Sequence, residues 1–236
     1  MDLNINFMFA ANHTKTTLGR SAILFCALCF YFTAGFSALS QNSERWEQAI
    51  KAFEVEDRKS HPPKGGVLFI GSSSIRKWDT LSEDFPDHDV INRGFGGSKI
   101  PDAIHFFERI VRPYEPSTVV LYAGDNDIGG GHTPSQVFEN FKMFADLLKK
   151  RLPKAKLVFI AIKPSIKRWN LAPKMKEANK MIKTYARKHR RVVFADVWNP
   201  MIGKDGKPRP DLFIEDGLHL NAAGYEIWKK VVSKRL

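Results

Sequence analysis

The sequence predicts an α/β protein, a three-layer α/β/α sandwich around a five-stranded parallel sheet. Five short apolar runs follow one another along the chain, and polar segments of helical character separate them. A strand that is apolar at every position is typical of a sheet buried on both faces. Because parallel neighbours need crossover connections, this alternation favours helices on both sides of the sheet. The 236 residues suffice for one sizeable core, and no internal repeat or long polar linker divides them.

The first element after a hydrophobic leader is an amphipathic helix over Ser43–Lys59. Its apolar residues recur among charged ones at helical spacing: Trp46, Ile50, Phe53 and Val55. Ser43 is a residue type that caps helix starts, and the prolines that follow His61 end the helix.

The predicted strands are the five apolar runs at 67–70, 90–91, 118–122, 157–161 and 192–195. A short helix through Ile75 and Trp78 follows the first strand. The other helices are predicted at 101–111, 134–151, 172–188 and 222–234. In sheets of this kind, ligands bind beyond the carboxyl ends of the strands.

Four short segments fall at that edge of the predicted sheet: Gly71-Ser72-Ser73-Ser74, Asn92-Arg93-Gly94-Phe95-Gly96-Gly97, Gly124-Asp125-Asn126-Asp127 and Asp216-Gly217-Leu218-His219. The first three follow the first three strands, and the fourth lies in the loop after the fifth strand. We therefore expect the four segments to meet in space.

Three residues in these segments supply a nucleophile, a base and an orienting carboxylate. Ser73 carries the hydroxyl, His219 can take its proton, and Asp216 lies three residues before His219, within reach of its imidazole. Each residue also has a simpler structural interpretation. Serines at 72–74 are common helix caps, and Asp216 is suited to cap the final helix beside an incidental histidine.

Three amide groups can serve as donors to an oxyanion: the backbone N–H groups of Ser73 and Gly97 and the side chain of Asn126. The paired glycines Gly96 and Gly97 also suit a tight turn, and Asn126 also suits a glycine-rich loop. The sequence predicts no metal site, because no second cluster of ligand residues accompanies His219. It predicts no cofactor, and the glycines at 129–131 lack the lysine and serine of a phosphate-binding loop.

At these four segments the chain resembles the SGNH, or GDSL-type, hydrolases. The segments at 71–74 and 92–97 look like the first two family blocks, Gly124-Asp125-Asn126-Asp127 matches Gly-x-Asn-Asp, and Asp216-Gly217-Leu218-His219 matches Asp-x-x-His. The likeness is greatest to secreted bacterial esterases and to catalytic subunits of platelet-activating factor acetylhydrolases. It implies a flavodoxin-like sandwich and ester hydrolysis through an acyl-serine intermediate without a cofactor.

The resemblance assigns the nucleophile to Ser73 and has one departure. Ser72 stands where the family usually has aspartate, and Ser74 stands where it has leucine. Three functions follow as alternatives. The first is hydrolysis of short-acyl esters, the second is removal of acetyl groups from a carbohydrate polymer held by Trp169 and basic residues, and the third is binding without turnover.

Residues 1–40 are predicted to be a signal peptide, and 41–236 the catalytic domain. Lys15 and Arg20 precede an apolar stretch over 21–39, and small residues before Ser40 form a cleavage pattern. This predicts a secreted or periplasmic protein, and an uncleaved membrane anchor is the alternative. Both cysteines, Cys26 and Cys29, lie within the stretch, so the cleaved protein contains no disulfide.

The formal net charge is +12, and much of the excess lies between Lys149 and Arg191, which hold sixteen basic residues and one acid, Glu177. Such a region can attract an acidic polymer or an anionic envelope surface. It can also be a solvated helix face that keeps the protein soluble. We expect no nucleic-acid binding, because no recognised binding module accompanies the charge.

Overall fold

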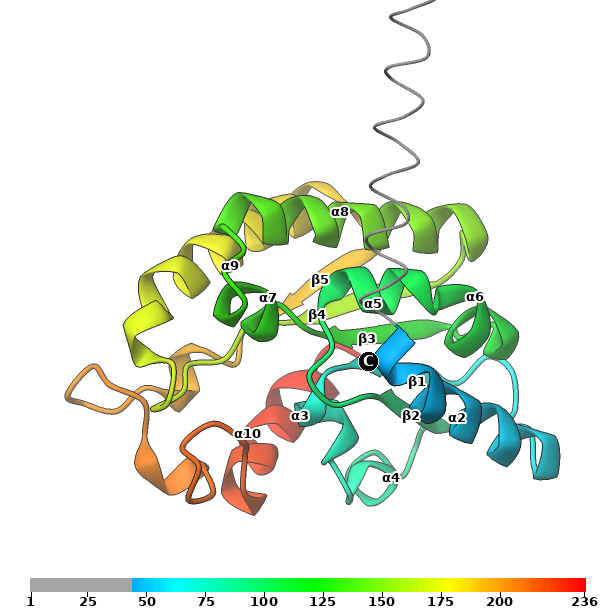
Figure 1. The fold of residues 1–236 in the computed structure, drawn as a ribbon, viewed down its shortest axis with the longest axis horizontal. Coiled ribbons are helices and arrows are strands. Elements are labelled where there is room, and N and C mark those ends of the chain that lie inside the picture. The colour runs from blue at the N-terminus through cyan, green and yellow to red at the C-terminus, as the bar shows by residue number, and fades with distance from the viewer. Residues whose placement is uncertain (1–43) are drawn as a thin grey trace, which may run out of the picture. The chain divides into compact units, whose positions relative to one another are not determined.

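The computed structural model describes residues 44–236, which form a five-stranded parallel sheet between two layers of helices (Figure 1). The strand order is β2-β1-β3-β4-β5. The strands are β1 (Val67–Gly71), β2 (Val90–Gly94), β3 (Thr118–Tyr122), β4 (Lys156–Ile160) and β5 (Val192–Ala195). The predicted fold class is confirmed, whereas the predicted leader at 1–40 lies outside the described residues.

Helices cover both faces of the sheet (Figure 1). One face carries α2 (Glu47–Lys59), α5 (Ile100–His105), α6 (Phe107–Ile110), α8 (Pro134–Arg151) and α9 (Ala172–Lys188). The other carries α3 (Ser73–Arg76), α4 (Leu81–Asp84) and α10 (Ala222–Ser233). The helix α7 (Asp125–Gly129) follows β3, and single 3-10 turns occur at Glu44–Trp46, Arg112–Tyr114, Trp169–Leu171, Asn199–Met201 and Pro210–Leu212.

The core consists of two apolar clusters, one on each face of the sheet. Successive side chains of a strand point to opposite faces, so Leu68 and Ile70 join the first cluster, while Val67 and Phe69 join the second. This explains why the first strand is apolar throughout. Among residues 44–236, no helix is long and apolar enough to cross a membrane.

Several predicted elements differ from the structure. The helix predicted through Ile75 and Trp78 is α3, which ends at Arg76, so Trp78 lies beyond it. The strand predicted at 90–91 continues to Gly94, because Arg93 pairs in register with Ile70 although its side chain is charged. That buried guanidinium donates a 2.5 Å hydrogen bond to Asp57, which balances its charge. The helix predicted at 101–111 is two short helices, because the backbone leaves the α conformation at Phe106, with φ −90° and ψ 4°.

The ends of three strands are level with one another. Gly71 pairs with Gly94 on one side and with Tyr122 on the other. At Gly71, φ is +143°, and an added Cβ would lie 1.9 Å from the carbonyl oxygen of Tyr122. Glycine therefore permits the close approach of β1 and β3 at the edge where the predicted site residues emerge.

Candidate active site

Ser73 is the accessible serine of its segment. The side chains of Ser72 and Ser74 are buried, with 0% and 1% of each residue exposed, whereas Ser73 is half-buried at the start of α3. The Ser72 hydroxyl has no hydrogen-bond partner among the described residues. Ser73 is therefore the hydroxyl of this segment that an ester can reach.

Ser73, His219 and Asp216 form a continuous hydrogen-bonded chain. The Ser73 Oγ lies 2.9 Å from His219 Nε2, and His219 Nδ1 lies 2.5 Å from Asp216 Oδ2. Burial acts to raise the pKa of Asp216, but hydrogen bonds from the side chain and backbone of His219 hold it well below its usual value. The ionised carboxylate accepts the Nδ1 proton, so Nε2 is left to accept the proton of Ser73.

A compact turn holds Asp216 against His219. Asp216 Oδ1 accepts hydrogen bonds from the backbone N–H groups of Leu218 and His219, each at 2.9 Å. Between them, Gly217 takes a φ of +62°, a conformation that favours glycine. The four residues therefore position the carboxylate by contacts within the turn itself.

Contacts at a distance bring this turn to Ser73. The Tyr225 hydroxyl of α10 donates to the carbonyl oxygen of Ser74 at 3.0 Å, across 151 positions of sequence. A β-bridge between Phe213 and Leu220 closes the loop that carries the turn. The start of α10 is thereby fixed beside α3.

The predicted backbone donor Gly97 lies in a turn after β2. Its φ is +77°, and an added Cβ would meet nothing within 4 Å, so the backbone conformation, and not lack of space, favours glycine. Among residues 44–236, its N–H has no hydrogen-bond partner. The preceding carbonyl oxygen, on Gly96, accepts a 2.7 Å hydrogen bond from Trp46 Nε1.

The predicted side-chain donor Asn126 lies in the first turn of α7. Its Nδ2 donates to the carbonyl oxygen of Ser98 at 3.1 Å, and its Oδ1 accepts from Arg168 Nη2 at 3.0 Å. An amide nitrogen carries two hydrogens, so one Nδ2 hydrogen stays available beside the contact with Ser98.

Asp127 joins the two loops that carry these donors, a role that was not predicted from the sequence. Its Oδ1 accepts from the Ile100 N–H at 3.1 Å, and its Oδ2 accepts from the Gly124 N–H at 3.0 Å. Burial raises the pKa of Asp127 to about 7. The Asp127 side chain thus fixes the β2–α5 loop to the β3–α7 loop; its place beside Asn126 in the motif was the available signal.

A buried cluster of charges lies behind Asn126. The carboxylate of Asp125 is 3.4 Å from Lys163 Nζ and 3.3 Å from Arg168 Nη1. Burial lowers the pKa of Lys163, whose Nζ also donates to the Tyr122 hydroxyl at 3.2 Å. In the sequence, Lys163 and Arg168 are recognisable only as members of the basic region, because no local pattern pairs them with the active-site segments.

The predicted residues share one open cavity of about 570 Å³, lined by Ser73, Gly97, Asn126 and His219. Asp216 does not line the cavity and contacts it through His219. This arrangement can activate a hydroxyl and offer N–H donors to the oxygen of a bound carbonyl group. Within residues 44–236, no group of three histidine, cysteine or acidic side chains is placed to hold a metal ion.

Comparison with known proteins gives consistent matches. The profile of the GDSL-like Lipase/Acylhydrolase family matches residues 70–227. Platelet-activating factor acetylhydrolase IB subunit alpha1 from Homo sapiens is 28% identical over 191 residues, covering 78% of this chain and 80% of that protein. Among solved structures, a GDSL-like lipase from Bacteroides thetaiotaomicron has a TM-score of 0.66 at 24% identity, covering 79% of this chain and 96% of its own. An acetyl-xylooligosaccharide esterase from Geobacillus Stearmophilus, solved as a mutant, has a TM-score of 0.59 at 17% identity. The match covers 73% of this chain and 94% of the esterase chain.

Proposed function

Because the chain belongs to the GDSL-like lipase/acylhydrolase family and is a hydrolase acting on ester bonds, we propose that it cleaves short-acyl carboxylic esters through an acyl-serine intermediate. The observation that carries this proposal is the unbroken chain of hydrogen bonds from Ser73 through His219 to Asp216. Gly97 and Asn126 line the same cavity as Ser73.

In the first half of the reaction, Ser73 Oγ attacks the carbonyl carbon of the ester while its proton passes to His219 Nε2. The negative charge develops on the former carbonyl oxygen, where the N–H groups of Ser73, Gly97 and Asn126 stabilise it. Asp216 stabilises the imidazolium that forms. The bond to the alkoxy oxygen then breaks, and the proton on Nε2 goes to the leaving alcohol.

In the second half, water takes the place of the alcohol. His219 Nε2 accepts a proton from the water as its oxygen attacks the acyl carbon, and the same donors hold the second oxyanion. The bond from the acyl carbon to Ser73 Oγ breaks, the proton returns to that oxygen, and the acid leaves. The cycle needs no oxidant, reductant or further co-reactant.

The test is hydrolysis of p-nitrophenyl esters from acetate to long acyl chains, with protein expressed from the full-length chain. We expect turnover to fall with acyl length, and Ser73→Ala to lose about 10⁴–10⁶ in kcat. Ser74→Ala, at the buried neighbouring serine, is the matched control and should retain activity. Equal turnover in Ser73→Ala and wild type would reject the proposal. Failure of a fluorophosphonate probe to label Ser73 would favour the third alternative, a protein that binds its ligand without turnover.

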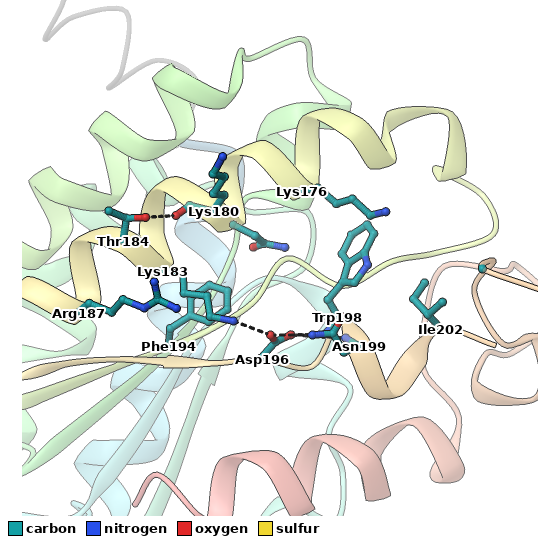
Figure 2. Close-up of a pocket in the computed structure, with 12 residues that line it drawn as sticks. Lys176, Lys180, Lys183, Thr184, Arg187, Phe194, Asp196, Trp198, Asn199 and Ile202 are labelled. Atoms are coloured by element: carbon teal, nitrogen blue, oxygen red, sulfur yellow. Dashed lines mark hydrogen bonds and ion pairs between the residues drawn. The ribbon is translucent and has the colours of Figure 1, made fainter. Parts of the chain in front are cut away.

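A second candidate, removal of acyl groups from an acidic carbohydrate, is favoured by a groove along α9 (Figure 2). The groove has a volume of about 600 Å³. Four of its lining residues are cations on α9: Lys176, Lys180, Lys183 and Arg187. Figure 2 shows Lys183 joined to Asp196, at 3.1 Å, and that carboxylate is the only acid lining the groove within the described chain.

Aromatic side chains connect the groove to the surroundings of the catalytic cavity. The Trp198 ring lies 5.5 Å from Lys176 Nζ and stacks on Trp169, with 6.2 Å between ring centroids. Trp169 follows Arg168, which contacts Asn126. Trp198 is 8% exposed, whereas Trp169 is half-buried and can offer part of its ring. A partly exposed ring near cations suits a sugar polymer with carboxylate or sulfate groups, since the ring offers apolar surface and the cations attract the charge of the polymer.

This candidate is tested by comparing deacetylation of acetylated polygalacturonate with that of acetylated dextran, which is neutral. A variant with Lys176→Glu, Lys180→Glu and Arg187→Glu should lose activity on the acidic polymer and retain it on p-nitrophenyl acetate. The matched control reverses three exposed cations outside the groove: Lys149, Lys150 and Lys154. An equal loss in both triple variants would mean that net charge, and not the groove, attracts the polymer.

Export of the protein is a proposal that rests on the sequence. We propose that residues 1–40 are a cleaved signal peptide, supported by Lys15 and Arg20 before the apolar stretch. Mass spectrometry of the protein expressed in a secreting host should find a mature amino terminus near Gln41. Retention of the leader in the membrane fraction would favour the anchored alternative.

A further inference from the structure

Two of the three candidate oxyanion donors, the Gly97 N–H and the Asn126 side chain, belong to amide groups whose oxygen accepts a hydrogen bond from another side chain. The N–H of Gly97 and the carbonyl oxygen of Gly96 belong to one planar peptide unit, and in a trans peptide they point in opposite directions. The side-chain amide of Asn126 is likewise a plane with an oxygen at one corner and a nitrogen at another. Fixing the oxygen of such a group therefore fixes the direction of its N–H.

We propose that Trp46 and Arg168 are positioning residues of the oxyanion hole, each hydrogen-bonded to the oxygen of an amide whose N–H receives the developing charge. Trp46 Nε1 donates to the Gly96 oxygen at 2.7 Å, and Arg168 Nη2 donates to Asn126 Oδ1 at 3.0 Å. This inference rests on the proposed function and adds two residues to it.

Trp46 is itself held in place by packing. It is 7% exposed, and its ring meets that of Phe95 edge to face, with centroids 5.8 Å apart. The guanidinium of Arg45 lies 3.7 Å from the centroid of the Trp46 ring. Since the indole has a single N–H, the contact with Gly96 uses its whole capacity to donate.

Arg168 is held by a buried carboxylate and by the catalytic turn. Its Nη1 lies 3.3 Å from Asp125 Oδ2, whose residue is 4% exposed. The neighbouring Lys167 N–H donates to the Gly217 oxygen at 3.0 Å, and Gly217 lies between Asp216 and His219. The segment Lys167-Arg168 thus contacts both the turn that carries His219 and the side chain of Asn126, the candidate oxyanion donor.

The two contacts have the same chemical effect. A donor on the oxygen of an amide draws electron density toward that oxygen, which makes the N–H groups of the amide better donors. It also removes the freedom of the amide to rotate away while the charge develops. Both effects favour the transition state over the bound ester, so they should appear in kcat rather than in KM.

The decisive experiment is a double-mutant cycle between Arg168 and Asn126, with p-nitrophenyl acetate as substrate. We expect Arg168→Ala to lower kcat by about 10–10² with KM unchanged. In the Asn126→Ala background, Arg168→Ala should cause no further loss beyond about twofold, because the group that it positions is gone. Arg168→Lys keeps the charge but not the planar fork, so it should recover only part of the loss.

Additive losses in this cycle would overturn the proposal for Arg168, and so would a rise in KM with kcat unchanged, which would indicate contact with the substrate. Melting temperatures measured for all four proteins separate positioning from unfolding. The cycle is read only after wild type shows turnover that Ser73→Ala abolishes. Absence of that turnover would reject the proposed function. The positioning role is then tested by the rate at which a fluorophosphonate labels Ser73, which should fall in Arg168→Ala; equal labelling rates would overturn the role.

For Trp46, the test is Trp46→Phe, which keeps an aromatic ring but removes the N–H. We expect kcat to fall about tenfold with KM unchanged. Trp228→Phe is the matched control, because Trp228 is buried on the opposite face of the sheet and its Nε1 has no partner among the described residues. It should lower the melting temperature without changing kcat. Equal kcat values for Trp46→Phe and wild type would overturn the role of Trp46.

Discussion

The two halves of the candidate active site are held together in different ways. Asp216 and His219 occupy one turn, whose carboxylate binds backbone N–H groups two and three residues away. The oxyanion half depends on contacts between distant segments: Asp127 to Ile100 over 27 positions, Arg168 to Asn126 over 42, and Trp46 to Gly96 over 50.

The carboxylates that hold the two halves also differ in burial. The side chain of Asp216 is one-third exposed, whereas that of Asp127 is fully buried. We infer that the two halves fail differently when altered. Changes in the turn should abolish most of the turnover and leave the fold intact, because the turn is at the surface. Changes in the oxyanion half should cost less turnover and more stability, because they leave buried polar groups without partners.

The largest effect on turnover is expected from His219→Ala. Without its base, Ser73 cannot lose its proton, and kcat should fall by about 10⁴–10⁶. The melting temperature should hardly change. Ester hydrolysis and thermal unfolding check both expectations, with His189→Ala, at an exposed histidine of another surface, as the control. A large loss of stability would contradict the surface character of the turn.

The next largest effect is expected from Asp216→Asn. The amide offers an N–H to His219 Nδ1, which favours the tautomer with its proton on Nε2, so kcat should fall by about 10⁴. Asp211→Asn, in the same long loop but outside the cavity, should keep wild-type turnover. If Asp216→Asn kept most of its activity, the expectation that changes in the turn remove turnover would be wrong.

Asn126→Ala removes one donor of the oxyanion half. Turnover of p-nitrophenyl acetate should fall by about 10²–10³ with little change in KM, since the donor acts mainly on the transition state. The loss is smaller than that in the turn because the Ser73 and Gly97 N–H groups remain. An increase in KM alone would show that Asn126 binds the ester in its ground state.

Asp127→Asn should have the smallest effect on turnover and a larger effect on stability. At acid pH the protonated side chain of Asp127 still has two oxygens that accept, from Ile100 and from Gly124, whereas the NH₂ group of asparagine cannot accept. We therefore expect a loss of about 1–3 kcal/mol in the free energy of unfolding at acid pH. Denaturant titration of both proteins measures it. A loss of turnover as large as that of Asn126→Ala would show that joining the two loops is itself catalytic.

The same variant tests the raised pKa of Asp127. Burial raises this pKa to about 7 in the folded protein, above the value of about 3.9 in unfolded chains. The stability linked to the bound proton is complete below about pH 4 and is lost as the pH rises through about 7. The difference in melting temperature between wild type and Asp127→Asn should therefore narrow from about pH 4 to about pH 8. A difference that is constant over this range would contradict the raised pKa.

Much of the fold could be read from the sequence because its signals are local. Five apolar runs and the helical segments between them specify the parallel sheet, and the positions of Ser73, Gly97 and Asn126 just after three strands follow from that order. The errors were local too. Polar residues hid the continuation of β2 to Gly94, because ladder pairing depends on the backbone and not on side-chain polarity.

The sequence by itself determined the layered fold and the turn from Asp216 to His219, because periodic apolar residues and contacts over three positions leave a pattern within a short window. Only the tertiary structure decided that Trp46 lies behind Gly96 and that Arg168 lies behind Asn126. From the sequence alone, a tryptophan in an amphipathic segment and an arginine in a basic region could form hydrogen bonds with many different partners. Packing of the two layers on the sheet chose these partners, and no spacing along the chain encodes that choice.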